Sequence, residues 1–250
     1  MILRLLVAAA SLILLTGLGA YIRYRYLLGK SVELQATTAN FSKTYSIGNS
    51  DGQVVRYVAL GDSTAAGVGA SRLEETYPYQ VAASLTDEGS MVDVTNLGIS
   101  GARLSDLIAS QLPGLSALHP TLITVSIGAN DATHRTEEAA YIRDLGMLIT
   151  YLKPYTQQGT VLMANVPQMR LAPAFPPIYR TYLDRRVKWE NEQLDRLVKG
   201  TGIQVIDLYG RGALDPKKTA GLYAADAFHP SDKGYLIWSD LFGGRVSASD

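Results

Sequence analysis

Short apolar runs that each stop at a glycine constrain the fold of this chain more than any other feature. Three such runs come early, and Gly61, Gly98 and Gly128 follow them. Amphipathic stretches with apolar residues at helical spacing separate the runs. This alternation is typical of an α/β domain built on a mostly parallel sheet. With two later runs it predicts a five-stranded sheet, with strands at residues 54–60, 91–96, 121–127, 161–166 and 203–208.

Helices are predicted between the strands and after the last one. In one of them Ile142, Leu145 and Ile149 recur on a single face, which gives that helix an apolar side for packing. Ligands of open α/β sheets bind beyond the carboxyl ends of the strands, so we expect the functional residues there. The predicted helices cover residues 77–85, 137–152, 179–199 and 232–242, with a shorter helix through 104–108.

The first 30 residues are predicted to form a transmembrane anchor with its flank. Residues 5–22 are 18 uncharged, mostly apolar residues, and as a helix they would span about 27 Å, close to the ~30 Å hydrocarbon core of a bilayer. A cleaved signal peptide, which would make the protein secreted, is the alternative interpretation. Arg4 precedes the span and Arg23 and Arg25 follow it, and these charges leave the side of the membrane open.

The rest of the chain divides into a linker and one domain. Residues 31–53 are rich in Thr, Ser, Asn and Gly, which predicts a polar linker, and residues 54–250 are predicted to form the domain. We expect this domain to be monomeric.

Composition excludes several function classes. Lysine plus arginine and aspartate plus glutamate both number 23, and no basic stripe is present, so we expect no nucleic-acid partner. The chain has no cysteine, which excludes disulfides, thiolate zinc sites and a cysteine nucleophile. The three histidines are scattered and no HExxH motif is present, so we expect no metal and no cofactor.

Ser63 is the candidate nucleophile, just past the end of the first predicted strand. A serine at the start of a helix is usually an N-cap, so its position alone does not make it reactive. The same position would let free backbone N–H groups and the positive helix end stabilise negative charge on a substrate oxygen. This loop does not fit nucleotide binding. Arg72 stands where a dinucleotide fingerprint needs glycine, and Ala66 and Gly67 break the P-loop pattern.

Two further turn clusters follow the second and third predicted strands. Gly98 and Gly101 lie in the first cluster, and Asn130 and Asp131 lie in the second. Each cluster alone is an ordinary turn, since glycine and asparagine adopt turn conformations at little cost. At one sheet edge they would bring a backbone N–H and a side-chain amide close to Ser63, and these are the donors that an oxyanion hole needs. Gly98 and Gly101 are both candidates for the backbone donor.

His229 differs from the other two histidines because Asp226 precedes it by three residues. Residues three apart share one face of a helical turn, so the carboxylate can accept a hydrogen bond from one imidazole nitrogen while the other faces a serine. Such a bond fixes the tautomer and stabilises the imidazolium that forms when the serine proton is taken. His119 and His134 are predicted to be structural or exposed.

Together these residues resemble the four sequence blocks of the SGNH (GDSL-type) hydrolase family. The resemblance implies a flavodoxin-like three-layer α/β/α sandwich. It implies that Ser63 is the nucleophile, that His229 is the base and that Asp226 orients His229. It further implies three oxyanion donors, the N–H groups of Ser63 and Gly101 and the Asn130 side-chain amide. The blocks, in the family's order over residues 54–243, are Gly61-Asp62-Ser63, Gly101, Gly128-x-Asn130-Asp131 and Asp226-x-x-His229.

The activity that the resemblance implies is hydrolysis of an ester through an acyl-serine intermediate. The expected substrate is an acyl lipid, as for a lipase or lysophospholipase, or an O-acetylated carbohydrate. An acyltransferase of the same fold would use the same intermediate, and a catalytically dead, membrane-tethered binding module is the alternative from another class. All five functional positions are filled, which favours an enzyme. Acyl chain length and head group stay open at this point.

Overall fold

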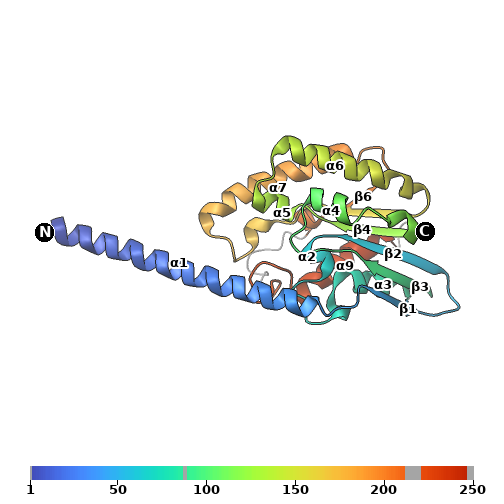
Figure 1. The fold of residues 1–250 in the computed structure, drawn as a ribbon, viewed down its shortest axis with the longest axis horizontal. Helices are drawn as coiled ribbons and strands as arrows, with labels where there is room; N and C mark the ends of the chain where they lie inside the picture. The colour runs from blue at the N-terminus through green and yellow to red at the C-terminus, as the bar shows by residue number, and fades with distance from the viewer. Residues whose placement is uncertain (1, 87–88, 212–220, 247–250) are drawn as a thin grey trace.

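A six-stranded sheet forms the centre of the protein in a computed structural model, which describes residues 2–86, 89–211 and 221–246, with backbone alone for residues 2–10, 12, 13 and 211 (Figure 1). The strand order is β1-β3-β2-β4-β5-β6. The pairings of β2 with β3 and β4, of β4 with β5 and of β5 with β6 are all parallel, so the five predicted strands are confirmed. Their bounds are β2 Val54–Gly61, β3 Met91–Asn96, β4 Leu122–Ser126, β5 Thr160–Ala164 and β6 Gln204–Ile206.

The sixth strand, β1 (Thr44–Gly48), lies inside the segment predicted to be a polar linker. It pairs antiparallel with β3 at the edge of the sheet, with Tyr45 opposite Val94. Tyr45 also stacks on Tyr79 at 5.5 Å between ring centroids. The structure therefore differs from the prediction over residues 31–53: the sheet begins about ten residues earlier than expected. Of the residues of this strand, Tyr45 and Ile47 pack against the apolar core. The strand contains no continuous apolar run from which it could have been predicted.

Helix α1 (Ile2–Thr38) extends away from the sheet domain (Figure 1). Among the helices whose residues are described, none is both long enough and apolar enough to cross a membrane. The predicted anchor is therefore not supported by the structure. Beyond residue 22 the helix carries Arg23, Arg25, Lys30 and Glu33, which shortens its uncharged part. Much of the predicted span, residues 5–10, 12 and 13, lies outside the side chains that the structure describes.

The predicted helices are confirmed, with ends that differ by a few residues. The largest difference is at α9, which ends at Val246, four residues later than predicted. Helix α7 begins two residues early because Pro177 suits the first turn of a helix. In the described part of the chain, four short 3₁₀ turns connect the elements: η1 Leu73–Glu75, η2 Leu115–Leu118, η3 Lys153–Gln157 and η4 Met169–Leu171. The α-helices after α1 are α2 Ser63–Ala66, α3 Tyr77–Thr86, α4 Leu104–Ser110, α5 Ala129–His134, α6 Glu138–Leu152, α7 Pro177–Leu197, α8 Leu208–Arg211 and α9 Asp232–Val246.

Two apolar layers cover the sheet and complete a three-layer α/β/α sandwich. One packs α4, α6 and α7 on one face, through residues such as Leu107, Leu148 and Leu194. The other packs α3 and α9 on the opposite face (Figure 1). There the rings of Tyr77 and Phe242 stack with their centroids 4.9 Å apart. All five residues of β4 are buried, as expected for the centre of a parallel sheet covered on both sides.

The strand order places a switch point between β2 and β4. Numbered among themselves, the five parallel strands run 2-1-3-4-5, the flavodoxin-like order, in which ligands bind where successive connections leave in opposite directions. Gly61 at the end of β2 lies opposite Ser126 at the end of β4. The segments that carry Ser63 and Asn130 both leave the sheet from this point.

Candidate active site

The first turn of α2 presents Ser63 at the end of β2. Asp62, not Ser63, caps the helix: Thr64 donates to Asp62 Oδ1 from its backbone N at 2.9 Å and from its hydroxyl at 2.8 Å. Ser63 is therefore the first helical residue and its hydroxyl is not used as a cap. Gly61 turns the chain with φ +145°, and a side chain there would collide with the Ser126 carbonyl. The helix ends after one turn at Gly67, in the left-handed conformation.

Buried carboxamides hold this turn in place, and sequence reasoning missed them. Gln111, at the end of α4, accepts from Gly61 N at 2.8 Å and donates to Gly61 O at 2.7 Å. Asn96, the last residue of β3, donates to Ala65 O at 2.7 Å. Both are common polar residues in sequence, and only the fold brings them to the turn that carries Ser63.

Ser63, His229 and Asp226 form one hydrogen-bonded chain. His229 Nε2 lies 2.9 Å from Ser63 Oγ, and His229 Nδ1 lies 2.6 Å from Asp226 Oδ2. The three residues are 7%, 5% and 2% exposed, so the chain is shielded from water yet Ser63 still reaches the cavity described below. The predicted partners thus meet although Ser63 and His229 are 166 residues apart.

Asp226 is held as a carboxylate by the turn that it begins. Its Oδ1 accepts from the backbone N of Phe228 and of His229, both at 3.0 Å. Burial alone would raise the pKa of Asp226, but the His229 hydrogen bond and charge and the two backbone donors outweigh burial and lower it. Ala227 has φ +59°, an uncommon conformation for a residue with a side chain, and its carbonyl accepts from Ala174 N at 3.0 Å. Hydrogen bonds to the Asp226 carboxylate and to the Ala227 carbonyl therefore both hold this turn in place.

The segment after His229 is attached to the loop that follows Ser63. The Asp232 carboxylate accepts from the backbone N and the hydroxyl of Ser71, both at 2.8 Å. Tyr235, fully buried in α9, donates to Val68 O at 2.6 Å. These bonds position His229 relative to Ser63 across the long gap in sequence.

Asp62 is a second buried carboxylate beside Ser63, and it differs from Asp226 in its surroundings. Burial raises the pKa of Asp62 to about 6, and the two Thr64 donors and the nearby His229 offset only part of that effect. The Thr64 hydroxyl also lies 2.8 Å from Ser126 Oγ, so the cap links the ends of β2 and β4.

The predicted oxyanion donors lie near one another, but in different surroundings. Asn130, in the first turn of α5, lines the same cavity as Ser63, and its Nδ2 donates to Ala102 O at 3.0 Å. Gly101, with φ +81°, precedes Ala102 in an exposed turn. It is not among the described residues that line the cavity. Gly98 N donates to Asn96 Oδ1 at 3.0 Å, which leaves Gly101 the better candidate for a free backbone donor.

A cavity of about 110 Å³ opens beside Ser63. Its described lining carries three titratable side chains, Asp62, Tyr223 and His229. The loop after β5 supplies part of the wall, and the segment before α9 supplies another part. Apolar side chains dominate the lining and include Ile127, Val166, Met169, Leu171, Phe228 and Trp238.

The other two histidines lie outside this chain of hydrogen bonds. His134 Nδ1 lies 2.9 Å from Asn130 O, and His119 ends the 3₁₀ turn η2 with φ +46°. Over the described ranges, no three His, Asp or Glu side chains are grouped so that they could hold a metal ion.

Comparison with known proteins identifies the family. The model of the GDSL-like lipase/acylhydrolase family matches residues 59–237, from the end of β2 into α9. The chain belongs to this family. Among curated members, it is 26% identical over 194 residues to a GDSL-like esterase of Mycobacterium tuberculosis, covering 75% of this chain and 60% of the relative. It is 39% identical over 90 residues to a lipase of Streptomyces rimosus, covering 32% of each chain. The chain thus spans 60% or less of the length of these relatives.

Solved structures of other proteins share the fold. A lipase/acylhydrolase from Enterococcus faecalis aligns with a TM-score of 0.63 at 20% identity, over 79% of this chain and 96% of that one. An acetylxylan esterase from Geobacillus stearothermophilus aligns with a TM-score of 0.59 at 21% identity, over 80% of this chain and 95% of that one. At these identities the likeness establishes the GDSL-type α/β fold and not the substrate.

Proposed function

We propose that this GDSL-family protein is a serine ester hydrolase in which Ser63 is the nucleophile, His229 the general base and Asp226 the residue that orients His229. The observation that carries the proposal is the continuous hydrogen-bonded chain from Asp226 Oδ2 through His229 to Ser63 Oγ, at 2.6 and 2.9 Å, beside an apolar cavity. A nucleophile within reach of a base that is itself oriented by a third group is the arrangement that activates a serine.

In the first half of the reaction, Ser63 Oγ attacks the carbonyl carbon of the ester while its proton passes to His229 Nε2. The resulting imidazolium is stabilised by the carboxylate of Asp226. When the tetrahedral intermediate collapses, the C–O bond to the alcohol breaks and the alcohol leaves with the proton from His229. The acyl group remains as an ester of Ser63.

Water completes the cycle through the same groups. His229 takes a proton from water as its oxygen attacks the acyl carbon, and then returns that proton to Ser63 Oγ as the carboxylic acid leaves. The oxyanion of both tetrahedral intermediates is assigned to the N–H groups of Ser63 and Gly101 and to Asn130 Nδ2. The present bond from Asn130 to Ala102 O supports the amide orientation, since the second hydrogen of the same NH₂ group is available to a substrate oxygen.

The cavity lining favours an acyl chain over a sugar as the group bound beside Ser63. A carbohydrate pocket needs many polar partners, because each buried hydroxyl that loses its hydrogen bonds to water must regain them. Here Val166, Met169 and Leu171, from the loop after β5, form apolar walls. Phe228 and Trp238, which come later in the chain, add apolar side chains to the lining. We therefore assign acyl lipids or other esters of apolar acids as the substrate class.

Substitution of the nucleophile tests the proposed chemistry. Ser63→Ala in the full chain should abolish p-nitrophenyl butyrate turnover and also labelling by a fluorophosphonate probe. Ser116→Ala, which changes an exposed serine in η2, is the control and should keep both. Unchanged turnover in the Ser63→Ala variant would refute the assignment. Ester binding by the parent with neither turnover nor probe labelling would indicate a binding module.

A series of esters tests the substrate class. Each methylene that enters the apolar cavity should contribute about 0.8 kcal/mol, or roughly fourfold in kcat/KM, until the cavity is filled. We expect kcat/KM to rise from the acetate to the butyrate and hexanoate p-nitrophenyl esters. Values that fall along this series, together with faster release of acetate from acetylated xylose oligomers, would instead assign a carbohydrate O-acetylesterase.

A further inference from the structure

A buried ion pair on α7 lies outside the chemistry proposed above. Arg186 Nε donates to Glu190 Oε1 at 2.7 Å, and the two side chains are 8% and 0% exposed. The Arg186 guanidinium also lies over the ring of Trp189, 4.5 Å from its centroid, and over that of Tyr141 at 5.5 Å. Removing two ions from water is costly, so a pair this deeply buried calls for a structural or functional reason.

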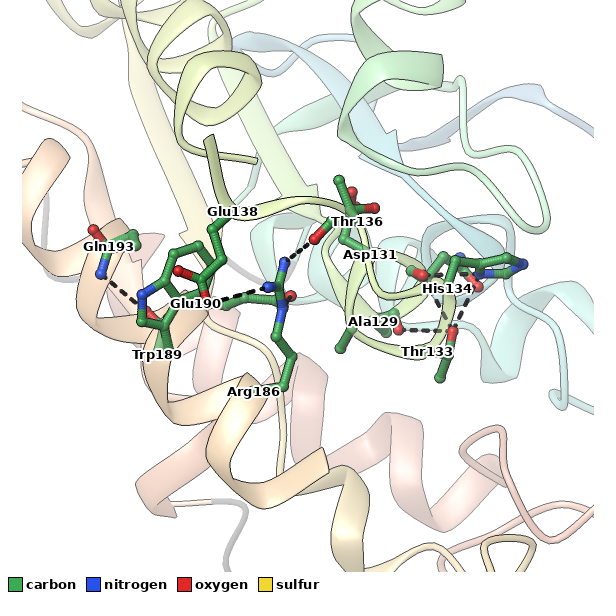
Figure 2. Close-up of polar contacts among 12 residues, drawn as sticks. Ala129, Asp131, Thr133, His134, Thr136, Glu138, Arg186, Trp189, Glu190 and Gln193 are labelled. Atoms are coloured by element: carbon green, nitrogen blue, oxygen red, sulfur yellow. Dashed lines mark hydrogen bonds and ion pairs between the residues drawn. The ribbon is translucent and has the colours of Figure 1, made fainter. Parts of the chain in front are cut away.

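The arginine reaches the carboxyl end of α5. Its NH2 group donates to Thr136 O at 2.8 Å, as Figure 2 shows. Thr136 N in turn donates to Asp131 O at 3.0 Å, closing the turn that ends the helix. Arg186 therefore holds the point at which the chain leaves α5.

The glutamate lies beside the amino end of the same helix. Gly128, which caps α5 with φ +117°, is packed so closely that a methyl group built on it would lie 3.7 Å from Glu190 Oε2 and 3.6 Å from the Tyr141 hydroxyl. Glu190 Oε2 has no hydrogen-bond partner among the described residues. Burial raises the pKa of Glu190 to about 8, although Arg186 acts in the opposite direction. The Glu190 carboxyl group therefore lies near this turn, and the hydrogen bond that it accepts comes from Arg186.

Between these two ends, α5 carries the residues that form the oxyanion side of the site. Asn130 donates to Ala102 O, and the Asp131 carboxylate accepts from Leu104 N at 3.0 Å. Both bonds attach α5 to the turn that contains Gly101. A shift of the six-residue helix α5 would therefore move the Asn130 amide and disturb the Gly101 turn together.

We propose that the Arg186–Glu190 pair is a positioning element for catalysis. Glu190 orients the Arg186 guanidinium, which fixes the carboxyl end of α5 and thereby holds the Asn130 amide where the oxyanion forms. The inference rests on the proposed function, because it assigns Arg186 and Glu190 an effect that acts only through Asn130. Neither residue lines the cavity among its described walls, so neither is expected to contact the substrate.

The test is a cycle of variants measured by kcat and KM on p-nitrophenyl butyrate. Arg186→Met with Glu190→Met removes both charges at similar volume, which avoids leaving one buried ion alone. We expect kcat to fall about 10- to 100-fold with KM within about twofold, since misplacing one oxyanion donor affects the transition state more than the bound ester. In the Asn130→Ala background the same double substitution should lower kcat by less than about threefold.

Controls separate this role from a merely structural one. Lys188→Met breaks the exposed ion pair with Asp184 on the same helix and should leave kcat unchanged in both backgrounds. If the double variant does not fold, Arg186→Lys replaces it. Lysine keeps a positive charge beside Glu190 but loses the guanidinium that joins Glu190 to Thr136 O, so the same fall in kcat is expected. An equal loss with and without Asn130, or no loss at all, would overturn the inference while the proposed function stands. Full turnover by both Ser63→Ala and Asn130→Ala would overturn both.

Discussion

Replacement of Asp62 by asparagine should stabilise the protein at neutral pH. The Asp62 carboxyl group is 2% exposed, and burial raises its pKa to about 6 from 3.8. The folded state therefore holds this proton more tightly than the unfolded state does. The contribution of protonated Asp62 to the free energy of unfolding is therefore fully present below about pH 4 and is lost as pH rises through about 6.

The size of the effect follows from that difference. At about 1.4 kcal/mol per pH unit, the interval from 3.8 to about 6 corresponds to about 3 kcal/mol, which the ionised Asp62 costs the folded protein at pH 7. Asparagine is neutral and its Oδ1 can still accept both bonds from Thr64. Asp62→Asn should accordingly raise the free energy of unfolding by up to about 3 kcal/mol at pH 7 and by close to zero at pH 4.

Urea unfolding of the parent and of the Asp62→Asn variant at half-unit steps from pH 4 to pH 8 measures this difference. Subtracting the two curves cancels the contributions of other carboxylates, including Asp226, whose lowered pKa acts in the opposite direction. A difference that does not change with pH would refute the reasoning, since Asp62 would then not titrate in this range.

Two further substitutions test the turns around the site. Asp226→Asn should lower kcat by about 10³- to 10⁴-fold, because an amide favours the wrong tautomer of His229; a loss below tenfold on p-nitrophenyl butyrate would argue against Asp226 as the orienting residue. Gly128→Ala should destabilise the protein by about 1–3 kcal/mol, since φ is +117° and the new methyl would lie 2.8 Å from Val166 Cγ2. Its control is Gly146→Ala within α6, where nothing lies within 4 Å and a gain of about 0.5–1 kcal/mol is expected; thermal unfolding that ranks the two variants the other way would contradict this assignment.

Much of the fold was predictable because its strands are buried on both sides. A strand such as β4 must be apolar throughout, and that run is visible in sequence. The edge strand β1 was missed because alternate residues face solvent and its segment reads as polar. Its place in the sheet depends on pairing with β3, which is distant in sequence and leaves no local signal. The continuation of α1 to Thr38 was missed for a similar reason, because the Ser and Thr residues within 31–38 are typical of a linker.

The site was predictable where its chemistry is local. Asp226 and His229 lie in one turn, and the structure places both with Ser63 in one chain of hydrogen bonds. The supporting residues were not predictable. Arg186 and Glu190 are an i,i+4 pair on a charged helix, and such a pair normally faces solvent. Only the packing of α7 against α5 and α6 places it inside.

The attachment of the Asp226–His229 turn to α9 has a consequence for how activity is lost. The proposed base and its orienting carboxylate lie within four residues, and the segment is attached through Asp232 and Tyr235 to the loop after Ser63. Local opening of this C-terminal unit would carry both groups away together and leave the serine behind with an unactivated hydroxyl. The protein would then exist as two populations, one fully active and one inactive, with no form of reduced activity between them. Thermal inactivation would follow the opening free energy of this unit and could precede global unfolding.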